Sequence, residues 1–228
     1  MRYQVIITDV TDYGPQHCVA AWDVVAQRMV RLEPGPASFW GKQFVGPDCP
    51  LWPGHIVEFE AIVPANQPYP HATEDIVVTV NTLRQVDAIE LSNLPGQVAG
   101  SVAITLPAIF RGLLRVVRSS AFVPVGSNCP SLGAIEIARA SIMFSERIWD
   151  GRRKLRAHYR YNDSNLNLGI TSSELRNAFF AGGLAGVGCT LPQQGRIHVR
   201  IGLSRPFAAR PNECYVQING IYPIPDGR

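Results

Sequence analysis

Alternating apolar and polar residues dominate the first part of the chain and predict short β-strands. Five such runs, rich in β-branched and aromatic residues and separated by turn signals, lie at 3–10, 17–24, 28–34, 55–63 and 75–80. In the fourth run, Val57, Phe59 and Ala61 share one face. Five short strands in about eighty residues predict a small barrel, which we assign to residues 1–84.

The pattern changes in residues 85–128, where apolar residues recur near helical spacing. Pro95 and Pro107 interrupt this pattern, so we expect two or three short helical pieces that act as a connector. Arg111, Arg115 and Arg118 would then form a basic stripe on one helix face. Such a stripe could bind phosphates, or it could simply be a solvated helix face.

Strand patterns return in residues 129–228, at 132–144, 154–161, 166–171, 196–204 and 214–224. A capping box from Thr171 to Glu174 predicts a helix over 171–180, which the glycine-rich loop 181–188 would end. Three strands, a helix and two strands is the order of an OB-type barrel. The sequence thus predicts a mainly β fold of two OB-like small β-barrels joined by a short helical connector.

Charge is divided unevenly between the two halves, although the net charge is only +3. Residues 1–110 hold 5 Lys and Arg against 11 Asp and Glu, a balance of −6. Residues 111–228 hold 16 against 7, a balance of +9, and only one of the sixteen is Lys. An arginine-rich half favours forked recognition of phosphate or stacking on bases, although arginines can also merely solvate a sheet.

The strongest candidate for such recognition follows the Asp-Gly turn at 150–151. Its basic residues are Arg152, Arg153, Lys154, Arg156, His158 and Arg160. If 154–161 is a strand, Lys154, Arg156, His158 and Arg160 lie on one face, spaced about 6.6–6.8 Å apart, similar to neighbouring phosphates. Strands two and three commonly form the binding face of an OB barrel, and this strand is the second of its set. Tyr159 and Tyr161 lie on the other face with Leu155 and could belong to the core.

Three further residues are candidates for ligand contact in the first barrel. Trp40 and Trp52 lie in a Gly/Pro-rich loop, where they could stack on bases or pin the loop to the barrel. His71 is three residues before Glu74 and four before Asp75. Pro68 and Pro70 disfavour a helix there, so we expect a structural role or a rim contact for His71 rather than a catalytic one.

Other function classes find little support. The five cysteines are scattered without C-x-x-C pairing, as in a reduced cytoplasmic protein, and the histidines form no recognisable metal-ligand pattern. No apolar run approaches the ~20 residues of a membrane span. We therefore expect no metal, no cofactor, no membrane association and no catalytic activity. A nucleotide-processing enzyme remains an alternative that rests on His71, Glu74 and Asp75 alone.

Several segments together resemble a known family. In the first half these are HCVAAWDVVAQRMVRLEP and PGHIVEFEAIVPANQPYPHATEDIVV, and in the second half LNLGITSSELRNAF, IGLSRPF and ECYVQINGI. They are similar to the strands of the bacterial dual OB-containing domain proteins. The resemblance implies two OB folds and nucleic-acid binding, with no defined reaction.

These observations lead to one main hypothesis and one alternative. We expect a non-enzymatic, cytoplasmic accessory protein that binds RNA or DNA through its second barrel and meets a protein partner through its acidic first barrel. The alternative is a protein–protein scaffold subunit whose basic half docks an acidic partner.

Overall fold

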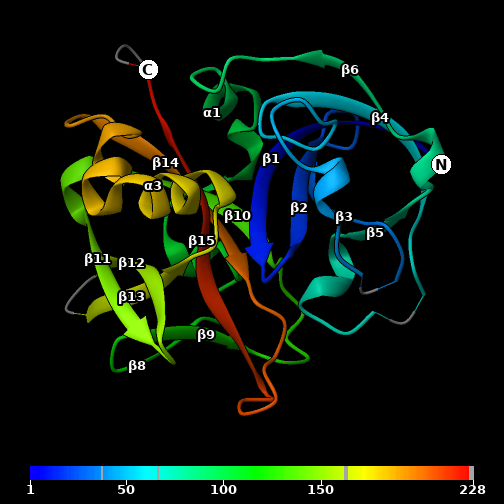
Figure 1. Cartoon of the computed structure of the whole chain (residues 1–228). Helices are drawn as coiled ribbons and strands as arrows, with labels where there is room; N and C mark the ends of the chain where they lie inside the picture. Colours follow the sequence, from blue (N-terminus) through cyan, green and yellow to red (C-terminus); the bar gives the residue numbers. More distant parts are fainter. Residues whose placement is uncertain (37, 66, 162–163, 226–228) are drawn as a thin grey trace.

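The computed structural model describes residues 1–36, 38–65, 67–161 and 164–225 and shows a mainly β protein built on two sheets (Figure 1). Within these ranges, no helix combines the length and the apolar composition needed to cross a bilayer. The predicted mainly β class is confirmed.

The first sheet contains β1 (Arg2–Tyr13), β2 (Gln16–Asp23), β3 (Arg28–Glu33), β4 (His55–Ile62) and β5 (Asp75–Val78). Its pairings run β1–β2–β3–β5–β4 and return to β1, so the sheet closes on itself. Only β3 and β5 pair in parallel. Val57, Phe59 and Ala61 are buried in its core as their alternation predicted, because successive side chains of a strand point to opposite faces.

The second sheet repeats this order with one bent strand. Its elements are β10 (Leu132–Ala138), β11 (Ile142–Trp149), β12 (Arg152–Tyr161), β13 (Ser164–Ile170), α3 (Ser173–Cys189), β14 (Arg196–Leu203) and β15 (Glu213–Pro223). A 3₁₀ turn, Arg139–Ser141, separates β10 from β11. β11 pairs with β12 and β10 pairs with β14, so the two halves of this bent strand complete the ring through β13 and β15. Helix α3 lies between the third and fourth strands, as predicted for an OB-type barrel.

Helix α3 differs from its predicted form at both ends. Its N-cap is Ser172, whose hydroxyl accepts a hydrogen bond from the backbone N–H of Leu175, rather than Thr171. The glycine-rich stretch 181–188 interrupts the helix at Gly183 (φ 62°, ψ −152°), as predicted. A second helical segment follows this kink and continues to Cys189.

The connector is less helical than predicted. It contains β6 (Arg84–Ala88), α1 (Leu94–Gln97), β7 (Val102–Ala103), α2 (Leu106–Ile109), β8 (Arg115–Val117) and β9 (Ser120–Pro124). The two helices have four residues each, and each carries a proline in its first turn, where proline is well tolerated. β6 extends the first sheet, whereas β7 and β9 pair with the second. The connector thus belongs to the edges of both sheets.

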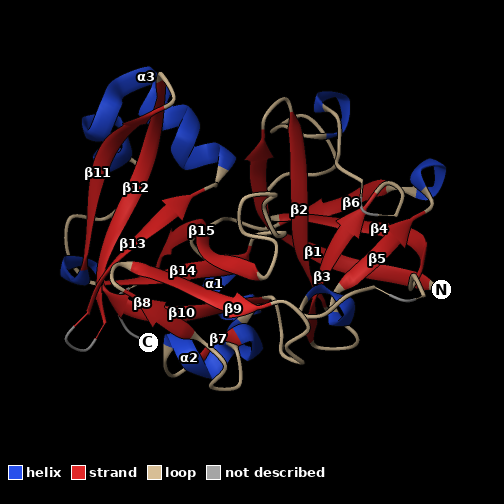
Figure 2. Ribbon diagram, turned by 90° about the horizontal axis from the view of Figure 1, so that it is seen from below, coloured by secondary structure: helices blue, strands red, loops and turns tan. Residues whose placement is uncertain are grey.

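The two barrels pack directly against each other (Figure 2). One buried cluster joins Trp22 and Met29 of the first sheet with Leu132 and Tyr222 of the second, and Leu94 and Val98 of the connector complete it. The Tyr222 hydroxyl donates to the Thr8 carbonyl across this boundary at 2.8 Å. This packing fixes which outer faces of the barrels remain open to solvent.

Candidate nucleic-acid interface

The second barrel presents a basic outer face on β11, β12 and β13, which we call the basic face. Leu155 and Ala157 of β12 point into the core, and the alternate side chains of this strand, Arg152, Lys154, Arg156, His158 and Arg160, point outward. The predicted row therefore forms on one face. It lies in the middle of three strands, because β12 pairs with β11 on one side and β13 on the other.

Arg153 does not belong to this face. It alternates with the outward residues, and its guanidinium binds Glu146 through Nε–Oε1 (2.6 Å) and Nη2–Oε2 (3.0 Å). The same group lies 4.8 Å from the centre of the Phe179 ring of α3. The sequence-based assignment of Arg153 to nucleic-acid binding is thus corrected by the strand register: it ties β12 to β11 and α3.

Two members of the row are fixed by neighbours. Arg156 donates from Nε to Asn167 Oδ1 at 2.7 Å and from Nη2 to the Asn167 carbonyl. Burial, with a smaller effect of the nearby Arg147 charge, lowers the pKa of Arg156 from its usual value. His158 Nε2 lies 2.8 Å from Ser145 Oγ. These contacts hold both side chains in place, whereas Arg152, Lys154 and Arg160 have no polar partner in the described ranges.

Strand β11 adds residues that the sequence reasoning missed. Trp149 pairs with Arg152 in the register and is 61% exposed, and the Arg147 guanidinium lies 4.8 Å from the centre of its ring. Met143 is also exposed and pairs with His158. The sequence contains a feature that could have identified Trp149. It directly precedes the Asp-Gly turn, so a hairpin across that turn brings it beside Arg152.

The outward positions of the three strands include no carboxylate in the described part of the chain. They carry Met143, Ser145, Arg147, Trp149, Arg152, Lys154, Arg156, His158, Arg160, Asn165, Asn167 and Gly169. Cations and amides without acids form a surface that attracts phosphates and donates hydrogen bonds to them. An exposed indole beside this surface can stack on a base.

The predicted basic stripe of the connector does not exist as a helix face. Helix α2 ends at Ile109, Arg115 lies in β8, and Arg118 (φ 56°) is in the turn before β9. Arg111 also has a positive φ of 52° and donates to the side chain and carbonyl of Asn128. The β8–β9 turn nevertheless lies beside β13 of the basic face, because the Ser119 carbonyl accepts from the backbone N–H of Asn167 at 2.8 Å.

Trp40 is not available for stacking. It is fully buried, its Nε1 donates to the Leu32 carbonyl at 2.8 Å, and its ring meets Phe44 edge to face. It pins the loop after β3 to the barrel, which was the alternative role considered from the sequence. Trp52 is half-buried in the same loop and forms no part of the basic face.

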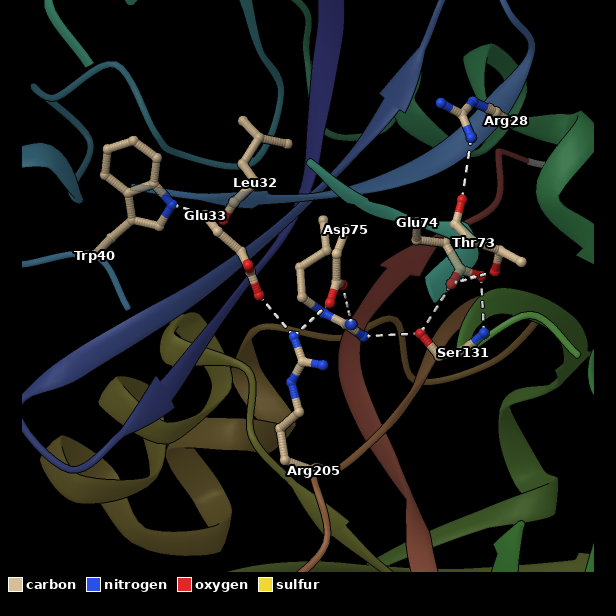
Figure 3. A network of polar contacts seen from close by, with 10 residues as sticks. Arg28, Leu32, Glu33, Trp40, Thr73, Glu74, Asp75, Ser131 and Arg205 are labelled. Carbon is tan, nitrogen blue, oxygen red and sulfur yellow. Dashed lines mark hydrogen bonds and ion pairs between the residues drawn. The ribbon is translucent and has the colours of Figure 1, made fainter. Parts of the chain in front are cut away.

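Glu74 and Asp75 lie between the barrels and take part in docking them (Figure 3), and His71 is buried in the turn just before them. Glu74 accepts from the backbone N–H and hydroxyl of Ser131, at 2.8 and 3.2 Å. Asp75 binds Arg31 Nη1 at 2.7 Å, and Arg31 Nη2 reaches Ser131 Oγ at 3.0 Å. Although strand alternation separates the two acids, they belong to one network because the second barrel covers this edge.

Arg205 of the second barrel completes the network. Its Nη2 lies 2.6 Å from both Glu33 Oε1 and Asp75 Oδ2. Burial raises the pKa of Glu74, and burial together with the nearby arginines lowers the pKa of His71 far below its usual range, so His71 is neutral. No group of three or more His, Cys, Asp or Glu in the described ranges is arranged to hold a metal ion. The cluster is a structural joint.

Comparison with known families identifies the family of this chain. The family model of the dual OB-containing domain matches residues 52–221, three quarters of the chain. The chain belongs to this family. The match begins just before β4 and ends within β15, so it includes the basic face and the joint at His71–Asp75. No curated protein matches the sequence. The two closed sheets agree with a dual OB-containing domain, a fold that commonly binds nucleic acids.

Proposed function

We propose that this dual OB-containing protein is a non-catalytic nucleic-acid-binding accessory protein. The basic face would hold single-stranded or structured RNA or DNA. The observation that carries the proposal is the grouping of Arg147, Arg152, Lys154, Arg156 and Arg160 on one outer face with no described carboxylate. OB folds use this part of the barrel, around strands two and three, for oligonucleotides.

The face supplies two kinds of contact. Side chains at alternate positions of β12 repeat every 6.6–6.8 Å or so, a spacing suited to successive phosphates of an extended strand. Trp149 offers a flat apolar surface at the edge of the row, where stacking on a base is worth roughly 1–3 kcal/mol. Phosphates would bind along β12 while a base lies over Trp149.

The first barrel has too few free cations to hold a nucleic acid itself. Several of its acids are used internally, since Asp9, Glu33 and Asp75 pair with arginines of the second barrel. Asp48, Glu60, Asp87 and Glu90 remain exposed. We propose that these exposed acids face a protein partner, which would make the chain an accessory subunit that places nucleic acid for another protein.

The test is fluorescence-anisotropy binding of single- and double-stranded RNA and DNA across a salt series. We expect the logarithm of the affinity for single strands to fall with the logarithm of salt concentration by about 0.7 per phosphate contact. In Arg152→Gln/Lys154→Gln this slope falls by about 1.4 if each cation engages one phosphate.

A matched control removes two charges elsewhere. Arg2 and Arg84 are exposed cations of the first barrel that share Glu58 as their partner. Arg2→Gln/Arg84→Gln alters the net charge equally and is expected to leave the slope unchanged. Equal losses in the two double variants would show a general charge effect and contradict a site on the basic face. Absence of binding at low salt would favour a protein–protein scaffold.

A further inference from the structure

A cavity of about 180 Å³ lies between the two barrels, beside the joint. It is lined by the end of β1 and by β3 from the first barrel, and by β15 and the segment after β14 from the second. Since a water molecule occupies about 30 Å³ of liquid, the cavity has room for about six waters, or for one small ring system.

Its lining combines flat rings with amide groups. Tyr13 and Phe39 stack on each other at its mouth, with ring centres 4.6 Å apart and planes at 14°. Gln217 and Asn219 project from β15, where the alternating Val216 and Ile218 are buried. Asn219 Oδ1 accepts from Thr171 Oγ1 at 3.1 Å, which orients its amide, and the Gln217 amide has no partner among the described residues.

The polar groups in the cavity are neutral or already paired. Arg31 and Arg205 each bind Asp75, and Arg205 also binds Glu33. His71 lines the cavity as a neutral imidazole, and its buried Nε2 finds no hydrogen-bond partner in the described ranges. This lining therefore suits a polar uncharged ring better than a phosphate, which would meet carboxylates beside each arginine.

The cavity wall and the basic face belong to neighbouring strands of one sheet. Gly169 of β13 pairs with Arg156 on one side and with Gln217 on the other. Two strand spacings, about 10 Å, thus separate the backbone of the basic row from the cavity wall. The Arg156 side chain extends over Gly169, since a Cβ there would lie 3.1 Å from Arg156 Nη1, so the basic row itself reaches toward the cavity wall.

We propose that this cavity binds a single nucleobase, either of a free nucleoside or of a strand that lies on the basic face. One ring of the stacked pair Tyr13–Phe39 would cover one face of the base. The amides of Gln217 and Asn219 would meet its edge, since carboxamides pair with the donor and acceptor groups of bases. The strand-borne form rests on the proposed function, whereas the free nucleoside form does not.

The test titrates the whole protein with adenosine, guanosine, cytidine and uridine, and separately with 12-nucleotide single strands. Gln217→Ala is compared with Gln85→Ala, which makes the same change on the exposed strand β6. We expect Gln217→Ala to weaken binding about fivefold or more, in line with the loss of one base contact. Gln85→Ala is expected to bind as the wild type does, and both variants are checked by thermal unfolding.

The outcomes distinguish a free nucleoside from a base carried by a strand. They also distinguish failure of the cavity proposal from failure of the proposed function. Nucleoside binding that Gln217→Ala weakens indicates a free nucleoside, even if no strand binds and the proposed function fails. Strand binding without nucleoside binding supports a strand-borne base if Gln217→Ala lowers the affinity while the salt slope is unchanged. If strands bind, nucleosides do not, and Gln217→Ala has no effect, the cavity proposal is overturned while the proposed function stands. If neither probe binds, both are overturned.

Discussion

Arg200 Nε lies 3.3 Å from Asp9 Oδ2, and this ion pair joins the two barrels in a fully buried position. Arg200 also donates to Ser101 Oγ at 2.7 Å, and Asp9 accepts from Thr8 Oγ1 at 2.8 Å. Burial raises the pKa of Asp9, and the Arg200 charge opposes this shift. The pair therefore depends on both partners, since either charge alone would be buried without compensation.

We expect Arg200→Met to lower the free energy of unfolding by about 3–5 kcal/mol. Asp9→Val should cost a similar amount, and the double variant less than the sum, because it leaves no lone buried charge. Urea unfolding of the four proteins measures this coupling. The exposed pair Arg2–Glu58 serves as control, where Arg2→Gln should cost less than about 1 kcal/mol. Additive losses at Arg200 and Asp9 would contradict the mutual dependence.

The buried histidines predict a loss of stability in acid. Burial lowers the pKa of His198 to about 3, with a smaller effect of Arg200, so the unfolded chain takes up the proton first as the pH falls below about 6.5. Stability should then fall by up to about 1.4 kcal/mol per pH unit for this group between those values.

His198→Leu tests this dependence, because leucine does not titrate. Neither ring nitrogen of His198 has a hydrogen-bond partner in the described ranges, and the nearest acid, Glu136, has its Oε1 3.6 Å from Nδ1. Urea unfolding at pH 7.5 and 5 should show a difference that is about 2 kcal/mol smaller in the variant. Glu74, whose pKa burial raises, gains stability in acid and acts in the opposite direction in both proteins. An unchanged pH dependence would show that His198 is not held neutral.

Trp149 should contribute to binding but not to folding. Its ring is mostly exposed beside Arg147, so Trp149→Ala removes a stacking surface without opening a cavity in the core. We expect the binding free energy for single strands to weaken by roughly 1–3 kcal/mol, with the salt dependence of binding and the melting temperature unchanged. Phe180 of α3 is exposed to a similar degree, 51%, and Phe180→Ala should leave binding unaltered. Equal effects of the two substitutions would remove Trp149 from the site.

The kink in α3 provides a matched pair of glycines. Gly183 has φ 62° and ψ −152°, a conformation almost confined to glycine, whereas Gly182 has no positive φ and open space around its Cα. Gly183→Ala should lower the free energy of unfolding by about 1–3 kcal/mol. Gly182→Ala should leave stability unchanged or raise it by up to about 1 kcal/mol. Thermal unfolding of the two variants measures the difference in stability. If both variants were as stable as the wild type, α3 would not be kinked at Gly183.

Part of the charge difference between the two halves is used in ion pairs between them. Asp9, Asp12, Glu33 and Asp75 of the acidic half pair with Arg176, Arg200 and Arg205 of the basic half. The sequence suggested that the basic half could dock an acidic partner, and the first barrel of the same chain is one such partner. Arginines used in this way are unavailable to nucleic acid, which leaves β11 and β12 as the main source of free cations.

The main strands of the two barrels and the outward row on β12 were predicted from the sequence alone, whereas the short strands β6 to β9 of the connector were not. Alternation along a strand decides which side chains share a face. The placement of Leu155 and Ala157 on the inner face, and of Arg156 and His158 on the outer face, therefore required no tertiary information. Turn residues set the ends of each strand within a few positions. These patterns depend only on residues close together in the chain, so they can be predicted from the sequence.

Only the tertiary structure decided where the faces meet. The pairing of β11 with β12 placed Trp149 beside Arg152 and turned Arg153 toward Glu146 and Phe179. Docking of the barrels buried the Asp9–Arg200 pair and formed the cavity at Gln217, whereas folding of the first barrel buried Trp40 in its core. Such contacts join residues up to 214 positions apart. Their partners come from other strands and the other barrel, so no local period in the sequence reveals them.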